Sequence, residues 1–368
     1  MNISSDNQTF SKIPKIGLGT FQLKNQTEED LRALLSNALK IGYRLFDLAE
    51  CYKNSKMVCS ILSQELPKLN LTRKDIFLTS KIQPKDQGLD KDKAIKACWK
   101  IIDDCRICHF DDDRSDDDDF LDLCLIHWPG TQKVKPQDFK NISNRQETWQ
   151  VMTCFYFLGY FKNIGVSNFK VRHLNTLHPL IEKERLEQIF QRIGEIRKEQ
   201  ENKTFDRVLE IDKIFKNQKQ IKPALIQNEH HLFYQDSECI EYCKENDIIY
   251  QSYSPFGQAK ILGPLEELVN NSNLMNELSE DHKSKAKLRE IINKYKNTHQ
   301  ISTAQFLLAY IIKQEILVIP KTSKVERLKE NFNCFVDIEE EDMVFLNEVR
   351  HEIPEMNQKT AWDPENII

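Results

Sequence analysis

The sequence predicts an α/β fold, a (β/α)₈ TIM barrel in which eight parallel strands alternate with helices. Short, nearly continuous apolar segments recur along the chain, as expected for parallel strands that are buried on both faces. Longer segments with an apolar stripe of helical period separate them. The segments expected as strands are 15–20, 44–49, 76–81, 121–127, 163–168, 224–229, 248–254 and 316–321.

The intervening segments carry the start signals and the periodicity of helices. The first helix is expected to begin at Thr27, which with Asp30 resembles a capping box, and to extend to Lys40. Further helices are expected at 56–66, 237–246 and 303–313. An open doubly wound sheet is the competing architecture, but its glycine fingerprint is incomplete, because Gln22 stands where a third glycine or alanine belongs.

The composition is that of a globular protein from the cell interior. The 368 residues carry a formal net charge of -5 with both signs mixed along the chain, which argues against a general nucleic-acid binder. No apolar run approaches the ~20 residues of a membrane span, and residues 1–12 lack the apolar core of a signal peptide. The ten cysteines are scattered and are expected as free thiols. We therefore expect a cytoplasmic protein that binds neither nucleic acid nor membrane.

Ionisable side chains lie near the ends of three consecutive predicted strands. Asp47 lies near the end of the second strand, Lys81 ends the third, and His127 ends the fourth. Tyr52 follows Asp47 in the loop that leaves the second strand. Each of these residues alone would be interpreted as a polar group that meets water. Because barrel enzymes have their active sites at the carboxyl ends of the strands, we expect the four side chains to meet at one rim.

A phenol, an ammonium, a carboxylate and an imidazole together suit the reduction of a carbonyl group. Tyr52 can donate a proton to the developing alkoxide, and a nearby Lys81 would bring the phenol pKa, ordinarily ~10, towards the working pH. Asp47 can hold Lys81 by an ion pair, and His127 can donate the hydrogen bond that orients the carbonyl. A cofactor delivers the hydride in such a reaction, and no metal is needed.

Several stretches resemble the motifs of the aldo-keto reductase family. They are GYRLFDLAECYKN at 42–54, LIHWP at 125–129, GVSNF at 165–169, YSPFG at 253–257 and IPKTS at 319–323. The similarity runs from about Phe10 to the end of the chain, with interruptions. The resemblance implies a (β/α)₈ barrel that binds NADP(H) across the rim. It also implies a catalytic set of Asp47, Tyr52, Lys81 and His127.

The same resemblance implies which residues contact NADP(H). Tyr253 would stack on the nicotinamide, where an aromatic face determines which hydride points at the substrate. Lys321 and Arg327 would bind the adenosine 2′-phosphate, which needs cationic, hydrogen-bonding partners, although such charges alone are typical of a solvated helix face. The full set implied for the cofactor is Thr20, Ser167, Asn168, Gln227, Tyr253, Ser254, Lys321, Thr322, Arg327, Glu330 and Asn331.

Aromatic residues near the rim line the substrate pocket in this family. Phe21 and Trp128 match that role, and Trp362 in the C-terminal segment is a further candidate. Gln83 stands two residues past Lys81, where some members carry a large aromatic side chain, so the pocket is expected to be more polar on that side. These residues predict a small-molecule carbonyl substrate without identifying it.

Two insertions are expected to interrupt a single barrel domain that spans residues 1–368. An acidic loop at about 103–119 separates strands 3 and 4, and a charged helical segment at about 182–222 separates strands 5 and 6. The helical segment offers a surface for a protein partner of an otherwise monomeric protein.

The acidic loop also contains two short patterns that imitate ion or cofactor sites. Its carboxylates partly imitate a calcium loop, but Asp116 stands where glycine is required. Cys105, Cys108 and His109 spell a haem-attachment pattern, and as a metal site they lack a fourth ligand. We expect free thiols and no metal.

The leading hypothesis is therefore an NADPH-dependent aldehyde or ketone reductase with Tyr52 as proton donor. The alternative is an NADPH-binding regulatory or redox-sensing barrel subunit with little turnover, for which the two insertions would serve a partner. A barrel hydrolase or isomerase is disfavoured, because no carboxylate pair or metal cluster emerges at the strand ends.

Overall fold

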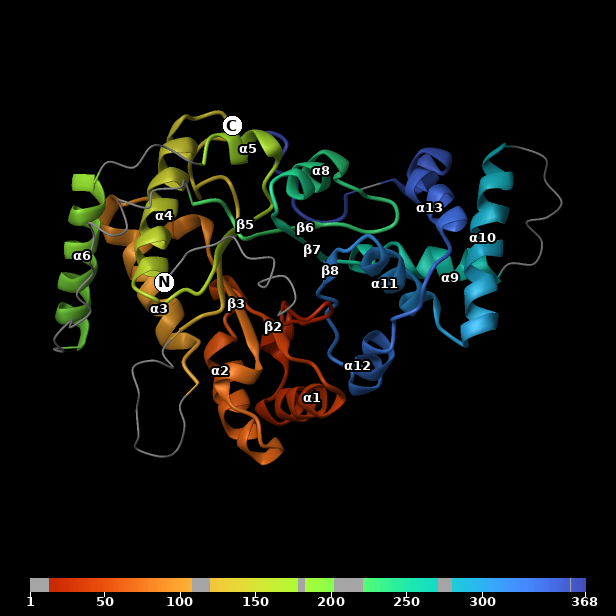
Figure 1. Cartoon of the computed structure of the whole chain (residues 1–368), viewed down its shortest axis with the longest axis horizontal. Coiled ribbons are helices and arrows are strands. Elements are labelled where there is room, and N and C mark those ends of the chain that lie inside the picture. The colour runs from red at the N-terminus through yellow and green to blue at the C-terminus, as the bar shows by residue number, and fades with distance from the viewer. Residues whose placement is uncertain (1–12, 108–119, 178–182, 202–220, 271–279, 358) are drawn as a thin grey trace.

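Eight parallel strands, paired in sequence order, form the centre of a computed structural model (Figure 1). It describes residues 13–107, 120–177, 183–201, 221–270, 280–357 and 359–368. The fold confirms the predicted barrel. Seven of the predicted strands are shorter than expected, and the third is shifted by one residue. The strands are β1 (Leu18–Gly19), β2 (Leu45–Asp47), β3 (Phe77–Ile82), β4 (Leu123–Ile126), β5 (Ile164–Ser167), β6 (Leu225–Glu229), β7 (Ile249–Tyr253) and β8 (Leu317–Val318).

The first and last strands also meet, so the sheet closes on itself. Parallel bridges pair Ile16 with Val318 and Gly19 with Lys321. The backbone N–H of Gly19 donates to the carbonyl of Pro320 at 3.1 Å. Closure leaves all eight carboxyl ends on one rim, which is where the predicted catalytic residues stand.

Helices surround the strands, as Figure 1 shows. The predicted helix starts are close to the observed ones: Thr27 caps the first helix by accepting from Asp30 N at 3.1 Å. The described helices are α1 (Glu28–Ile41), α2 (Ser55–Glu65), α3 (Lys93–Asp104), α4 (Lys140–Phe157), α5 (Val171–Asn175), α6 (Lys183–Glu201), α8 (Ser237–Glu245), α9 (Leu262–Asn270), α10 (Glu280–His299), α11 (Thr303–Lys313), α12 (Val325–Phe332) and α13 (Glu340–Glu352).

Alternate residues of each strand pack into two different cores. Leu123 and Leu125 of β4 belong to a cluster that also contains Leu45 and Leu225 from other strands. Cys124, between them, packs in the larger cluster that the strands share with the helices. The strands are therefore buried on both faces, which is why they were recognisable as continuous apolar segments.

Helix α6 belongs to the segment predicted as a charged helical insertion, and it packs against α3 and α4 at one side of the barrel (Figure 1). Its apolar face is buried, with Ile193 fully inaccessible. Arg197 pairs with Asp103 through two contacts of 3.0 Å and lies over the Trp99 ring. The helix is thus fixed to the helical layer, and a protein partner for its outer face stays a prediction.

The acidic segment before β4 begins differently from the prediction. Helix α3 extends to Asp104, so Asp103 and Asp104 belong to a helix, and residues 108–119 lie outside the described residues. Cys105 is buried, whereas Cys108 and His109 are not described. Among the described residues, no group of histidine, cysteine and acidic side chains could hold a metal ion, and no helix is long and apolar enough to cross a membrane.

Candidate active site

The four residues predicted to be catalytic lie at the carboxyl ends of β2, β3 and β4. Asp47 is the last residue of β2, and Tyr52 ends the one-turn helix Glu50–Tyr52 that follows. Lys81 is the last but one residue of β3, and His127 directly follows β4. The parallel register of these strands brings their ends side by side.

Lys81 is completely buried, and its ammonium group donates three hydrogen bonds within this site. Its Nζ donates to Asp47 Oδ2 at 2.6 Å, to the Leu48 carbonyl at 2.9 Å and to the Tyr52 hydroxyl at 3.3 Å. An ammonium has three protons, so this geometry holds it between a carboxylate and a phenol. A buried charge of this kind requires such partners, because without them its desolvation would be too costly.

Tyr52 carries a proton at neutral pH in this environment. Burial raises the pKa of its phenol well above the ordinary value, and the negative charge of Asp47 raises it further. The sequence-based expectation was the opposite direction, with Lys81 lowering the pKa. Burial is the largest cause of this rise in the Tyr52 pKa, and the charge of Asp47 is the next largest. A protonated phenol is the form that a proton donor needs.

The His127 ring lies next to the phenol and is neutral. Burial lowers the pKa of His127 well below its ordinary value, and the nearby Lys81 ammonium lowers it further. The ring stands edge-on to Tyr52, with 5.8 Å between ring centroids. The backbone carbonyl of His127 accepts a hydrogen bond of 2.9 Å from Asn168 Nδ2, which holds this loop against the start of the next one.

A cavity of about 550 Å³ opens at this rim, and Asp47, Tyr52 and His127 line it. Lys81 does not line the cavity, but it contacts two residues that do, Asp47 and Tyr52. The residues implied for the cofactor that also line the cavity are Ser167, Asn168, Gln227, Tyr253, Ser254, Lys321, Thr322, Arg327, Glu330 and Asn331. One cavity therefore extends from Asp47, Tyr52 and His127 to the positively charged side chains of Lys321 and Arg327.

The residues implied for the nicotinamide form a hydrogen-bonded network that includes Asp47. Gln227 Nε2 donates to Asp47 Oδ1 at 2.8 Å, and the Ser167 hydroxyl donates to the Gln227 carbonyl at 2.8 Å. The Tyr253 hydroxyl donates to Asn168 Oδ1 at 2.5 Å, and Asn168 Nδ2 donates to Ser167 Oγ at 3.1 Å. These contacts fix the polar wall before any ligand is present.

Thr20 differs from the other residues implied for the cofactor. It is fully buried and does not line the cavity. Its hydroxyl donates to the Asp47 carbonyl at 2.8 Å, and its own carbonyl accepts from Asn54 Nδ2 at 2.9 Å. In this structure Thr20 supports the end of β2, and contact with a cofactor stays a prediction.

Aromatic side chains stand on the open side of the cluster formed by Asp47, Tyr52 and His127. Phe21 lines the cavity with its ring 5.2 Å from Tyr52, and Trp362 lines it with its ring 5.7 Å from His127. Trp128 does not line the cavity itself but stands edge-on to Trp362 at 6.2 Å. The described lining of this side is therefore aromatic.

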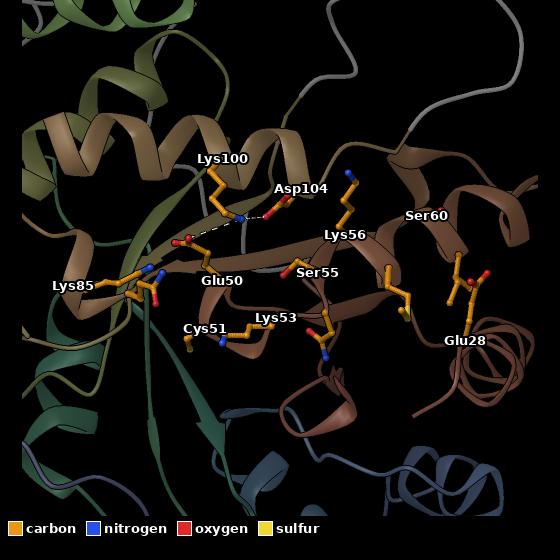
Figure 2. A pocket seen from close by; sticks show the side chains of 14 residues that line it. Glu28, Glu50, Cys51, Lys53, Ser55, Lys56, Ser60, Lys85, Lys100 and Asp104 are labelled. Atoms are coloured by element: carbon orange, nitrogen blue, oxygen red, sulfur yellow. Dashed lines mark hydrogen bonds and ion pairs between the residues drawn. The ribbon is translucent and has the colours of Figure 1, made fainter. Parts of the chain in front are cut away.

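Gln83 lies elsewhere. Directly after it the chain turns into the short helix Pro84–Asp86, and Gln83 lines a second hollow of about 680 Å³ on the other side of the Glu50–Tyr52 helix. Figure 2 shows this hollow, where Glu50, Cys51 and Lys85 gather. A role for Gln83 in substrate binding stays a prediction, with no support from its position.

Glu229, at the end of β6, holds the C-terminal segment in place, and sequence reasoning missed it. Its carboxylate accepts from the backbone N–H of Thr360 at 2.8 Å and of Ala361 at 3.0 Å, and Lys359 Nζ lies 3.3 Å away. Burial alone would raise the pKa of Glu229, but hydrogen bonds from His231 and Thr360 lower it to about 2. This anchor holds the segment that carries Trp362. A carboxylate that ends a strand was the available signal.

The rest of the C-terminal segment is held by α4 and α5. His173 Nε2 contacts the Ile367 carbonyl at 2.8 Å, and its Nδ1 accepts from Lys170 N at 3.0 Å. The Arg145 guanidinium donates to the Ile368 carbonyl at 2.5 Å. Trp362 therefore stands between two anchored stretches.

The fold and the site together define a parallel barrel with a buried lysine, carboxylate and phenol cluster at its carboxyl rim. The model of the aldo/keto reductase family matches residues 15–350, and the chain belongs to that family.

Known proteins resemble the chain over nearly its full length. Aldose reductase C of Dictyostelium discoideum is 29% identical over 339 residues, which is 88% of this chain and 82% of that protein. Glycerol 2-dehydrogenase (NADP(+)) of Hypocrea jecorina is 26% identical over 356 residues, 93% of this chain and 90% of that protein. The crystal structure of an aldo-keto reductase from a Medee basin deep-sea metagenome library superposes with a TM-score of 0.64 at 25% identity, covering 97% and 96% of the two chains.

Proposed function

We propose that the protein reduces aldehydes or ketones to alcohols with NADPH, and that Tyr52 donates the proton. One observation carries the proposal: Lys81 Nζ lies 2.6 Å from Asp47 Oδ2 and 3.3 Å from the Tyr52 hydroxyl, at the edge of a cavity. The names of the relatives point the same way, because aldose reductase C acts on a carbonyl compound and glycerol 2-dehydrogenase uses NADP(+).

The residues of the cavity fit a nicotinamide dinucleotide phosphate. Tyr253 offers a flat aromatic face near the catalytic cluster, and its hydroxyl is already satisfied by Asn168. At the other end, Lys321 and Arg327 offer positive charge, as a phosphate requires. Glu330 and Asn331 add polar groups beside Arg327 for the adenine.

Bound NADPH supplies the hydride. The protein supplies the remaining chemistry: His127 donates a hydrogen bond to the carbonyl oxygen, and the Tyr52 hydroxyl gives its proton to that oxygen as negative charge develops. Lys81 stabilises the phenolate that remains on Tyr52, and Asp47 keeps Lys81 in place. Phe21 and Trp362 shield this step from water on the open side.

The variant Tyr52→Phe tests the proton donor. It removes the hydroxyl and keeps the ring, so kcat/KM with a panel of aldehydes should fall by about 10²- to 10⁴-fold. The affinity for NADPH, measured by calorimetry, should stay near the wild-type value. Tyr242→Phe, on α8 and outside the cavity, is the matched control and should leave both quantities unchanged.

Two results would overturn the proposal. Turnover by Tyr52→Phe close to that of the wild type would remove Tyr52 as the donor. A wild-type protein that binds NADPH but oxidises it with no carbonyl compound would instead favour the regulatory or redox-sensing subunit. The oligomeric state, predicted as monomeric, and a cytoplasmic location are independent of this test.

A further inference from the structure

A thiol touches the imidazole of the proposed active site. Cys51 Sγ lies 3.5 Å from His127 Nδ1, within the range of a sulfur hydrogen bond. Cys51 stands directly before Tyr52 on the same one-turn helix, so its position is set by the backbone that also carries the phenol. The contact has no part in the mechanism given above.

Cys51 occupies the wall between the two cavities. It lines the polar hollow of Figure 2, while the ring that it contacts lines the active-site cavity. Among the nine cysteines that the structure describes, Cys51 is the one that is not fully buried. Position 51 therefore borders a polar hollow, which can accommodate a polar side chain in place of the thiol.

The His127 ring has one proton to place on two nitrogens. Because the ring is neutral, either Nδ1 or Nε2 carries the proton, and the partner of one nitrogen decides the state of the other. Cys51 Sγ is the hydrogen-bond partner of Nδ1, and within the described residues no protein group bonds Nε2. The state of Cys51 thus determines what His127 offers to the cavity.

The thiol is better suited to donate than to accept in this contact. Burial raises the pKa of the Cys51 thiol, so it keeps its proton at neutral pH. If S–H donates to Nδ1, then Nε2 carries the ring proton and can donate a hydrogen bond to a carbonyl oxygen. If instead Nδ1–H pointed at sulfur, Nε2 would be a bare acceptor and could not stabilise that oxygen.

We propose that Cys51 is a positioning residue that holds His127 in the Nε2–H tautomer by donating its thiol proton to Nδ1. Cys51 acts on the substrate only through His127. This role rests on the proposed function, because it matters when His127 donates to a carbonyl oxygen.

The test compares Cys51→Ala, which removes the donor, with Cys51→Ser, which retains an O–H donor at nearly the same place. Loss of one ordinary hydrogen bond predicts a fall in kcat/KM of about three- to tenfold for Cys51→Ala. Cys51→Ser should recover most of it. Met57→Ala changes an exposed side chain of the same hollow and is the matched control, with no expected effect.

The decisive measurement is the tautomer itself, read from the ¹⁵N chemical shifts of selectively labelled histidine. Wild type and Cys51→Ser should show His127 with a protonated Nε2, and Cys51→Ala should show an increased share of protonated Nδ1. A purely structural role for Cys51 would lower activity without moving these shifts.

Two results would overturn the inference. The first is an unchanged His127 tautomer in Cys51→Ala, whatever happens to kcat/KM. The second is a Cys51→Ser protein with the same shifts and the same loss as Cys51→Ala, since then the hydrogen-bond donor is not what matters. The ¹⁵N readout needs no turnover, so failure of the proposed reductase activity would be seen separately, as an inactive wild type.

Discussion

The corner of the cavity formed by Asp47, Tyr52 and His127 and the C-terminal segment that carries Trp362 line the same cavity, but they are built in different ways. Asp47, Lys81 and His127 stand at the ends of neighbouring strands, so backbone pairing places them. Trp362 stands in an irregular segment that is held by side chains of β6, α4 and α5. The positions of Asp47, Lys81 and His127 thus follow from the barrel, whereas the position of Trp362 depends on a few polar contacts.

This difference predicts that substitutions in the two regions change different measured properties. A change in the corner should abolish chemistry and leave the outer pocket intact. A change in the anchors of the C-terminal segment should alter stability and substrate range while the Asp47, Lys81 and Tyr52 contacts persist.

The largest effect is expected for Lys81→Met, which keeps the length of the side chain and removes its charge. The phenolate of Tyr52 would lose its neighbouring ammonium, so kcat/KM in NADPH oxidation should fall by about 10²- to 10⁴-fold. The affinity for a bulky aromatic inhibitor should change little, because Lys81 does not line the cavity. A variant within about tenfold of wild-type activity would show that the corner does not depend on this charge.

A smaller effect is expected on the stability of the folded protein at low pH, because His173 contacts the C-terminal segment. Burial and the nearby cations Arg145 and Arg172 lower its pKa from 6.5 to about 4. As the pH falls, the unfolded chain therefore binds this proton first, and the folded state loses stability between about pH 6.5 and 4. The difference between these pKa values corresponds to at most about 3 kcal/mol.

The variant His173→Gln isolates this contribution. Glutamine can still donate to the Ile367 carbonyl, but it does not titrate. Urea unfolding at several pH values should give a flatter dependence between pH 6.5 and 4 for the variant than for the wild type. Parallel curves for the two proteins would rule out His173 as the acid-sensitive anchor.

The smallest effects are expected for two variants that each weaken one contact of the C-terminal segment, one buried and one exposed. Glu229→Gln replaces an acceptor of the Thr360 and Ala361 N–H groups with an amide, and should cost about 1–3 kcal/mol of unfolding free energy. KM for aromatic aldehydes should rise, since Trp362 follows these residues. Glu365→Gln removes an exposed pair with Arg172 and should cost at most about 1 kcal/mol.

Comparison of these two variants in kinetics and unfolding decides whether the segment has one dominant anchor. If Glu365→Gln raised KM as much as Glu229→Gln, the segment would be held by many equal contacts instead. Binding of NADPH should be the same in both variants, because neither residue lines the cavity.

The strands were predictable because burial on both faces leaves a continuous apolar segment. The positions of Asp47, Lys81 and His127 were predictable because each lies at or just past the end of such a segment. The approximate ends of the strands were predictable too, and the pairing of β3 with β4 explains why Lys81 and His127 lie near each other. Residues 108–119 and 202–220, within the two predicted insertions, lie outside the described residues, and the boundaries of the insertions stay predictions.

Contacts between distant parts of the chain were not predictable. Glu229 looked like an ordinary strand end, and nothing local links it to Thr360. In the sequence Cys51 is one of ten scattered cysteines, and only the fold shows that its sulfur lies beside His127. The position of Gln83 was not predictable either: it stands two residues past Lys81, but the backbone turns there and Gln83 lines the other hollow.

The pairing of Ile16 with Val318 has a consequence for how the chain can be made. Synthesis proceeds from the amino end, so β1 emerges long before its neighbour β8 exists. Every growing chain that stops short of Val318 therefore carries an open strand edge, which is the kind of surface that invites pairing with other chains. The barrel closes only after β8 has been made, and until then one edge of β1 lacks its partner strand.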